Sequence, residues 1–406
     1  MSNRTHRRNR TGRPRGRLAG LGLAAALLAV PLVYQVPASG ASERNQPVTA
    51  LPRARVDTGR PRFSHPTRIS NPLFPITATK QMVALGEEGE TRLRQETTLL
   101  DRTRTIRWNG QDVEAIVSQF VAYGDDRIVE TAIDYFAQAD DGSVWYFGED
   151  VSTYEAGAVK SHAGTWLAGK DGPPGMIMPA HPKVGDVYRP ENIPGLVFEE
   201  TTVKATGLTV AGPSGPIHNA IRVEEHPADG DVETKVYAPG YGEFDATVPA
   251  SAEHVVSAIA VPTDAKRGNE PKALDSLSDS AREVFGRAGS DRWSKLRREV
   301  DALHGAWDQL TSAGVPTGLE AEMQRAVEAL DSAGAAHDRA GLAQAALDAE
   351  FAAMDIELQY TDRAEVDHDR IGSWKRQRQL HETAGDAAGV ASDRVIVGAI
   401  KDRPTQ

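Results

Sequence analysis

The sequence has no cysteine and no excess of basic residues. Without cysteine there are no disulfides, zinc–thiolate sites, iron–sulfur clusters, thiol nucleophiles or cysteine-linked lipid anchors. The formal net charge of −11 over 406 residues disfavours a general nucleic-acid binder, because phosphate backbones require a basic face. Hydrophobic residues make up 40% and charged residues 25%, which is ordinary for a chain that folds around a core. At roughly 150 residues per domain, the length predicts two or three domains.

Motifs of nucleophilic, zinc and phosphate chemistry are also missing. The segment Gly212-Pro213-Ser214-Gly215 does not have the Gly-x-Ser-x-Gly spacing of a hydrolase nucleophile. The sequence contains no phosphate-binding glycine loop, no His-Glu-x-x-His motif and no dinucleotide fingerprint. We therefore expect a binding or structural role rather than an enzymatic one.

The N-terminus has the pattern of a secretory signal. Residues 1–17 contain seven arginines and no acidic residue, and residues 18–36 carry no charge. Ser39 and Ala41 are small residues suitably spaced for cleavage before Ser42, which predicts a signal peptide over residues 1–41 and a secreted or extracytoplasmic protein. The alternative is an uncleaved anchor, because an uncharged stretch of this length nearly spans a bilayer. Removal of the seven arginines would lower the formal charge to −18.

The next two segments predict a linker and then a β domain. Residues 42–70 are rich in proline and arginine and lack apolar periodicity, which predicts a solvated linker. Residues 71–262 contain short alternating runs between turn signals. The clearest hairpin joins residues 133–138 and 143–147 through Asp141-Gly142, since glycine supplies the positive φ of a tight turn. Consecutive strands without helices predict an antiparallel meander, either a strongly curved sheet or a barrel.

The C-terminal part predicts helices. Residues 263–275 are polar and predict a hinge, with few contacts between the flanking domains. Beyond it, apolar residues recur every three to four positions in four stripes and a shorter fifth segment, which cover residues 293–310, 319–337, 343–358, 367–381 and 386–401. Short connections between such helices predict an up-and-down bundle over residues 276–403. The expected fold class is therefore α+β in separate domains.

Several phrases of the β region carry a family resemblance. They are Asn71-Pro72-Leu73-Phe74-Pro75, Trp145-Tyr146-Phe147-Gly148-Glu149, Val184-Gly185-Asp186-Val187-Tyr188-Arg189 and Tyr237-Ala238-Pro239-Gly240-Tyr241-Gly242. Together they resemble a family of exported bacterial proteins of no established function, which implies a curved β meander over most of residues 71–245. The sequence departs from that family at two places. At His181 the family has asparagine, and at residues 243–245 the closing strand of the family is more apolar than it is in this sequence.

The helical part resembles an exported bacterial module, also of no established activity. The phrases are Asp355-Ile356-Glu357-Leu358-Gln359-Tyr360, Ala364-Glu365-Val366-Asp367 and Trp374-Lys375-Arg376-Gln377. Neither resemblance implies a catalytic residue.

The aromatic hairpin suggests a ligand site. Tyr135, Trp145, Tyr146 and Phe147 cover both faces of the predicted strands, although a sheet with one solvated face should be apolar on the other face alone. One interpretation is that one face lies in the core and the other packs beneath a loop or the helical bundle. The other is that these residues bind a small apolar ligand in the mouth of a barrel or half-barrel.

Paired acidic residues recur at Asp125-Asp126, Asp140-Asp141 and Glu149-Asp150. We expect all three pairs in turns, because aspartate forms local hydrogen bonds there. The alternatives are acid–base work on a glycosidic bond and calcium binding.

A metal site in the bundle is a further hypothesis. In the predicted bundle His304, Asp355, Glu365 and His368 lie at a similar height, and histidines and carboxylates on facing helices bind metals in such folds. The alternative is that these histidines make ordinary hydrogen bonds near helix ends.

The leading interpretation is a non-enzymatic binding or structural module of the cell envelope or the secreted fraction. Its expected partner is a small apolar ligand or an envelope component, with no nucleic acid. It would touch the membrane only through an uncleaved N-terminal segment. A metal- or cofactor-binding protein that uses the bundle is the second interpretation, and a carboxylate-dependent hydrolase is the third. No cofactor other than such a metal is expected.

Cleavage of the signal gives the first testable prediction. The mature protein should begin at or near Ser42, because the small residues Ser39 and Ala41 precede it. N-terminal sequencing of the exported protein measures this directly. Recovery of residues 1–41 on a membrane-associated protein would show an anchor instead.

Overall fold

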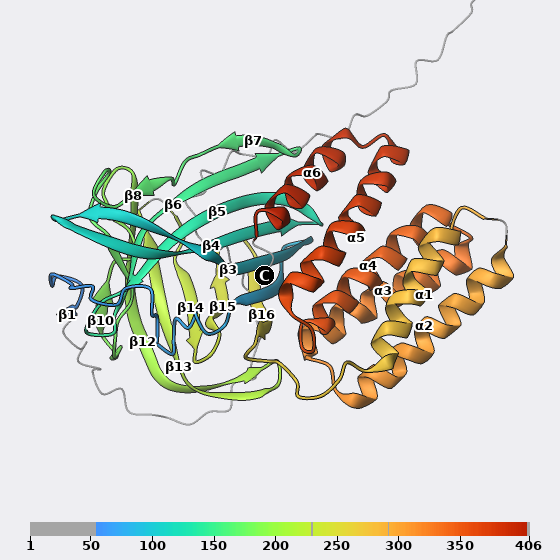
Figure 1. Ribbon diagram of the computed structural model, residues 1–406, viewed down its shortest axis with the longest axis horizontal. Coiled ribbons are helices and arrows are strands. Elements are labelled where there is room, and N and C mark those ends of the chain that lie inside the picture. The colour runs from blue at the N-terminus through green and yellow to red at the C-terminus, as the bar shows by residue number, and fades with distance from the viewer. Residues whose placement is uncertain (1–53, 229, 291, 404–406) are drawn as a thin grey trace, which may run out of the picture.

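The computed structural model describes residues 54–228, 230–290 and 292–403. A single rolled β-sheet is followed by six helices on one side of it (Figure 1), which confirms the predicted α+β fold class. The predicted signal peptide, residues 1–41, lies outside the described residues. No helix in the described part of the chain is long and apolar enough to cross a membrane.

The strands make one continuous sheet. They are β1 (Ala54–Arg55), β2 (Gln81–Glu88), β3 (Thr91–Trp108), β4 (Gln111–Gly124), β5 (Arg127–Gln138), β6 (Val144–Glu155), β7 (Ala158–Ser161), β8 (Trp166–Leu167), β9 (Gly175–Met178), β10 (Asp186–Tyr188), β11 (Asn192–Ile193), β12 (Val197–Gly212), β13 (Gly215–Pro227), β14 (Glu233–Ala238), β15 (Gly242–Val248) and β16 (Glu253–Val261). Neighbours follow chain order along β2–β7 and along β12–β16, and β16 pairs antiparallel with β2. The predicted hairpin is confirmed, because β5 and β6 pair with Phe136 opposite Tyr146.

The sheet rolls until its two ends approach each other. At one end β9 pairs with β6, and at the other β10 pairs with β12. A Cβ atom added at Gly175 of β9 would lie 1.8 Å from the carbonyl oxygen of Pro190, just after β10. Only glycine permits so close an approach of two backbones. The roll therefore has an inner face that is shielded on most sides and an outer face that other elements must cover.

Residues 54–70 are part of the β domain. The amide of Val56 donates a 2.9 Å hydrogen bond to the carbonyl of Val187, and Ile69 is buried. Phe63 packs edge-on against Phe147 with ring centroids 5.3 Å apart. The predicted linker is therefore wrong for residues 54–70, because their scattered apolar side chains cover the outer face of the aromatic hairpin.

The helices are α1 (Lys272–Arg287), α2 (Trp293–Ala313), α3 (Thr317–Ala336), α4 (Arg339–Glu357), α5 (Arg363–Ala384) and α6 (Ala387–Lys401). The carboxylates of Asp338, Asp362 and Asp386 cap the starts of α4, α5 and α6, which satisfies amide groups that have no partner within the helix. Helices α1–α4 form a bundle in which α1 packs on α2 and α4, whereas α5 packs on α4 and α6. Sequence analysis missed α1, although Leu274, Leu277, Ala281 and Val284 recur at helical spacing and are buried.

The β and helical parts share one interface. Val83 and Ile259 of the sheet belong to the same buried apolar cluster as Leu319 and Met323 of α3. Further along the outer face, Tyr123 of β4 stacks on Trp374 of α5. The expectation of few contacts across the hinge is therefore wrong. The polar hinge connects the two parts along the chain, but the apolar outer face of β2, β4 and β16 needs the helices to cover it.

Six charged side chains meet in this interface, five of them buried and one, Arg94, 20% exposed. They are the arginines Arg94, Arg370 and Arg403 and the acids Glu96, Asp355 and Asp367. The Arg403 guanidinium donates to Glu96 over 2.6 Å and to Asp367 over 3.0 Å. Although burial opposes its charge, the arginines Arg403, Arg94 and Arg370 hold the pKa of Glu96 well below its usual value. Each charge thus has an opposite partner, as buried charges require.

Removal of Arg403 should destabilise the whole protein. Arg403→Ala leaves Glu96 and Asp367 short of a partner, and loss of one member of a buried ion pair costs roughly 3–5 kcal/mol. Urea denaturation measures the loss in the free energy of unfolding. Lys401→Ala, at an exposed position two residues away, is the matched control and should change stability by less than about 0.5 kcal/mol. Equal midpoints for both variants would contradict the assigned role of the cluster.

Candidate functional site

A cavity of about 180 Å³ opens on the inner face of the rolled sheet. Its apolar wall comes from the segment before β2 and from strands β5, β6 and β15, through Phe74, Ile76, Phe136, Tyr146 and Phe244. An apolar cavity of about 150 Å³ is large enough to hold benzene. The cavity therefore has room for an apolar group about the size of one ring.

The cavity is also lined by acidic side chains. The carboxyl groups of Asp134, Glu191, Glu199, Glu225 and Glu243 line it, together with the ammonium of Lys235. Because side chains alternate along a strand, acids two residues apart, or directly opposite on paired strands, lie on the same face. By this rule the inner face also carries the buried residues Glu130, Glu149, Glu233 and Glu253.

Lys235 neutralises one group of these acids. Its Nζ lies 2.5 Å from the carboxylate of Glu225, 3.2 Å from Glu233 and 3.7 Å from Glu243. Burial acts to lower the pKa of Lys235, but these three carboxylates raise it well above its usual value. Lys235 is therefore a permanent cation in this half of the cavity.

A second group of acids has no such cation. It consists of Asp134, Glu149, Glu191 and Glu199, and no described arginine, lysine or histidine forms an ion pair with any of them. Asp134 accepts a 2.8 Å hydrogen bond from the Tyr146 hydroxyl, and Glu191 Oε1 accepts one from the Trp166 indole. Within the described residues, no donor reaches Glu191 Oε2 while the carboxyls are ionised, although Glu191 is only 4% exposed, and a proton on Glu149 would join these two carboxyls by a hydrogen bond.

The environment of this second group favours protonation. Burial raises the pKa of Asp134 to about 6 and that of Glu191 to about 7. Burial, reinforced by the neighbouring carboxyl of Glu191, raises the pKa values of Glu149 and Glu199 well above the usual range. These are the shifts expected where carboxyls are desolvated without an opposite charge.

The four aromatic residues of the predicted ligand site divide between the two faces. Tyr146 lines the cavity, whereas Tyr135, Trp145 and Phe147 do not. Phe147 lies beneath Phe63, and the ring of Tyr135 lies beneath the Arg104 guanidinium. The interpretation that one face of the hairpin packs beneath a loop therefore holds for Phe147.

The acidic pairs show what sequence analysis missed. Asp125-Asp126 and Asp140-Asp141 lie in turns as predicted. The prediction is wrong for Glu149-Asp150, because Glu149 lies within β6 and is fully buried. The sequence did contain a signal for the buried acids. Glu225, Glu233 and Glu243 occupy strand positions whose side chains point to the inner face of the sheet. An acidic residue on the inward face of a strand indicates a polar interior.

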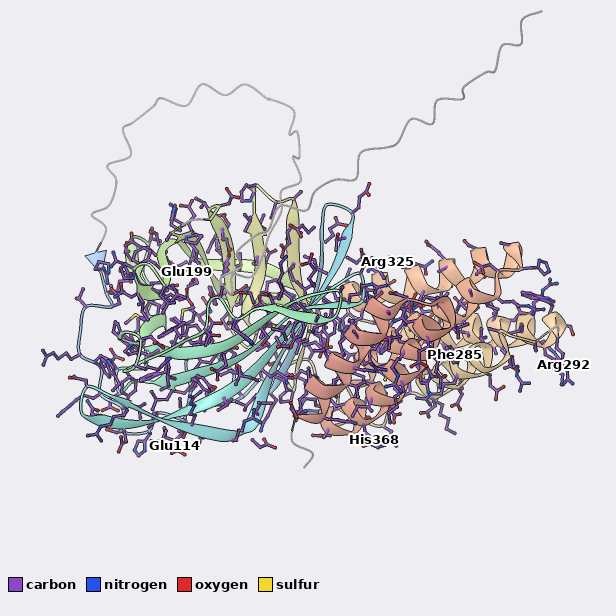
Figure 2. The ribbon with its side chains drawn as sticks, turned by 90° about the horizontal axis from the view of Figure 1, so that it is seen from above. Glu114, Glu199, Phe285, Arg292, Arg325 and His368 are labelled. Atoms are coloured by element: carbon purple, nitrogen blue, oxygen red, sulfur yellow. The ribbon has the colours of Figure 1, made fainter. Side chains whose placement is uncertain are left out.

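The structure does not assemble the predicted metal set. His304 on α2 bonds to Asp331 of α3 at 3.0 Å, and Asp355 is paired with Arg94 and Arg370. Glu365 and His368 are exposed on α5, and Figure 2 shows His368 on the outside of the helical region. Over the described ranges, no group of three or more histidine or acidic side chains could hold a metal ion. The unpredicted α1 is the physical reason, because it lies beside α2 and α4 and changes which helices face each other.

The cavity combines an apolar wall with hydrogen-bonding and charged groups on rigid strands. Such a surface binds a small ligand that has an apolar body and a polar end. No family model matches the chain, and no curated protein or solved structure is similar to it.

Trp145 should contribute to stability rather than to ligand binding. Its side chain is 5% exposed and lies outside the cavity lining, and truncation of a buried tryptophan to alanine costs roughly 3–5 kcal/mol. Thermal melts of Trp145→Ala should show a sharply lowered midpoint. Val159→Ala, at a residue 52% exposed on β7, should leave the midpoint nearly unchanged. A Trp145→Ala melt like that of wild type would contradict the core assignment.

Stability should fall as the pH rises above neutrality. Burial, and then Glu88 and Glu233, raise the pKa of Glu253 to about 9. The folded state therefore binds more protons than the unfolded state between about pH 4.5 and pH 9, so this contribution to stability is present at low pH and is lost as the pH rises. Glu253→Gln should weaken the pH dependence seen by urea denaturation. Glu87→Gln, at an exposed site on β2, should leave the pH dependence unchanged. If wild type and both variants lose stability equally with rising pH, Glu253 is not the source of the pH dependence.

Proposed function

We propose that this protein is a non-enzymatic binding protein that holds a small ligand in the cavity of its rolled sheet. The observation that carries the proposal is the cavity itself, about 180 Å³ in volume, lined by both apolar and acidic side chains. These side chains stand mainly on hydrogen-bonded strands, so the site is formed before the ligand arrives. Preformed sites lose little conformational entropy on binding.

The cavity has a route to solvent. Phe74, Ile76, Phe120 and Ile177 line it and are partly exposed, and Lys80 at its edge is exposed. Exposed apolar side chains at the mouth of a concave site are typical of proteins that take up ligands from solution. We place the entrance among these residues.

Export is part of the proposal. It is supported by the arginine-rich start, the uncharged stretch at residues 18–36 and the small residues before Ser42. The resemblance of the β phrases to exported bacterial proteins points the same way. In this proposal the binding domain works outside the cytoplasm.

A carboxylate-dependent hydrolase is the second candidate. It is favoured by one specific feature, which is that Asp134 and Glu191 line the same cavity away from turns and have pKa values raised to about 6 and about 7 by burial. Acid–base hydrolysis uses two carboxyls with different protonation states. Turnover of aryl glycosides that is abolished by Asp134→Asn would favour this candidate over simple binding.

Ligand-observed NMR with benzyl alcohol tests the binding proposal. We expect saturation transfer from the protein to the ring, because the cavity accepts a group of that size. Ala84→Leu adds volume at a buried residue of the lining and should weaken binding roughly tenfold or more. Ala158→Leu makes the same change at an exposed residue of β7 and should have no effect. The absence of transfer in wild type, or equal binding by Ala84→Leu, would count against the cavity as the site.

A further inference from the structure

The two groups of cavity acids differ in one respect, which is the presence of a cation. Glu225, Glu233 and Glu243 share Lys235. Asp134, Glu191 and Glu199 line the same cavity but form no ion pair within the described residues, and Lys235 acts on Glu191 and Glu199 only from a distance. Glu191 Oε2 receives no hydrogen bond from a described side chain, and Glu191 and Glu199 are only 4% and 8% exposed.

An organic cation fits this second group better than a metal ion. Metal binding needs several oxygen atoms that converge on one point, and the described residues contain no group of three or more that could do so. The wall around these acids is instead aromatic. Phe136 and Tyr146 stack with ring centroids 4.8 Å apart, and Trp166 meets Tyr146 edge-on. Aromatic faces attract organic ammonium groups and also accept the apolar body that carries them.

We propose that the ligand of this cavity is a small organic monoamine, whose ammonium pairs with Glu191 and Glu199 and whose ring-sized apolar body packs against Phe136 and Tyr146. The inference rests on the proposed binding function and adds the chemical class of the ligand. Glu199 lies on β12 among the strands of the rolled sheet (Figure 2). The ammonium of the ligand gives Glu191 and Glu199 the positive charge that Lys235 gives to Glu225, Glu233 and Glu243.

The protonation behaviour of the site is consistent with this assignment. Burial holds the pKa of Glu191 near 7 and that of Glu199 well above its usual range. A bound ammonium stabilises the ionised carboxyl and so reverses part of that shift. The site therefore favours a cation over a neutral molecule of the same shape most strongly under mildly alkaline conditions.

A charge series of matched probes tests the proposal. Benzylamine, benzyl alcohol and benzoate have the same ring and nearly the same size but carry a positive charge, no charge and a negative charge. Isothermal titration at about pH 8 should show benzylamine binding at least about tenfold more tightly than benzyl alcohol, because hydrogen bonds to charged groups are the stronger ones. Benzoate should not bind, since the carboxylates of Asp134 and Glu191, with pKa values of about 6 and about 7, repel it at this pH.

Two variants at neighbouring residues show whether the preference for a cation arises inside the cavity. Glu199→Gln removes a carboxyl that can ionise beside a bound ammonium, with little change in shape, and should reduce the affinity for benzylamine about tenfold, while leaving benzyl alcohol unaffected. Glu200→Gln makes the same change on the outer face, where Glu200 pairs with Arg189 at 2.9 Å. It should bind all three probes like wild type. Thermal melts of both variants establish that they are folded, and the wild-type charge series stands independently of them.

The alternative outcomes separate the two proposals. Equal affinity for benzylamine and benzyl alcohol would overturn the amine assignment but leave the binding function intact. Binding of neither probe would overturn both proposals. Displacement of benzylamine by calcium chloride, but not by sodium chloride of equal ionic strength, would overturn the amine in favour of a metal ion. Tighter binding of N-acetyl-lysine methylamide than of benzylamine would overturn the free amine in favour of a lysine side chain.

Discussion

The outer face of the sheet depends on the buried ion cluster at the helical interface. Arg94 and Glu96 stand on β3, and their partners are Asp355 of α4, Arg370 of α5 and Arg403, two residues beyond the end of α6. Charged groups can remain on the apolar side of a sheet only if opposite charges meet them there. Their pairing fixes α4 and α5 against the sheet and allows Tyr123 to stack on Trp374. The bundle α1–α4 is held both through α4 and through α3, whose Leu319 and Met323 share a buried cluster with Val83 and Ile259 of the sheet.

The inner face of the sheet also carries buried ionisable groups, but it does not pair each of them with an opposite charge. Its acids outnumber its cations, because Lys235 is shared by three carboxylates and the Asp134–Glu199 side has none. Protonation keeps such groups neutral at a cost in stability that grows with pH. One sheet thus has an outer face with balanced charge and rigid packing, and an inner face with unbalanced charge around a void. That contrast distinguishes the structural face from the proposed binding face.

The sequence predicted the strands and helices better than it predicted which of them pack against each other. Strand alternation, the Asp141-Gly142 turn and the helical stripes from Trp293 onward were sufficient for the α+β class. They did not reveal that Phe63 and Ile69 cover the hairpin, because scattered apolar residues between prolines have no period. Alternation also cannot show whether an inward face meets a core or a cavity, so the place of Glu199 in the cavity lining was not predicted, and Glu191 lies between strands where alternation does not apply. Because α1 was not predicted, the expected positions of His304 and His368 relative to each other were wrong.

The pairing of Arg403 with Glu96 has a consequence for how the chain is made. These residues are 307 positions apart, and contacts so distant in sequence slow folding because a long loop must close first. During synthesis the β strands are complete long before α6 exists. Until then Glu96 and the apolar residues Val83 and Ile259 have no helices to cover them. The nascent β domain therefore exposes apolar and charged side chains on β2, β3 and β16 until the helices have been made.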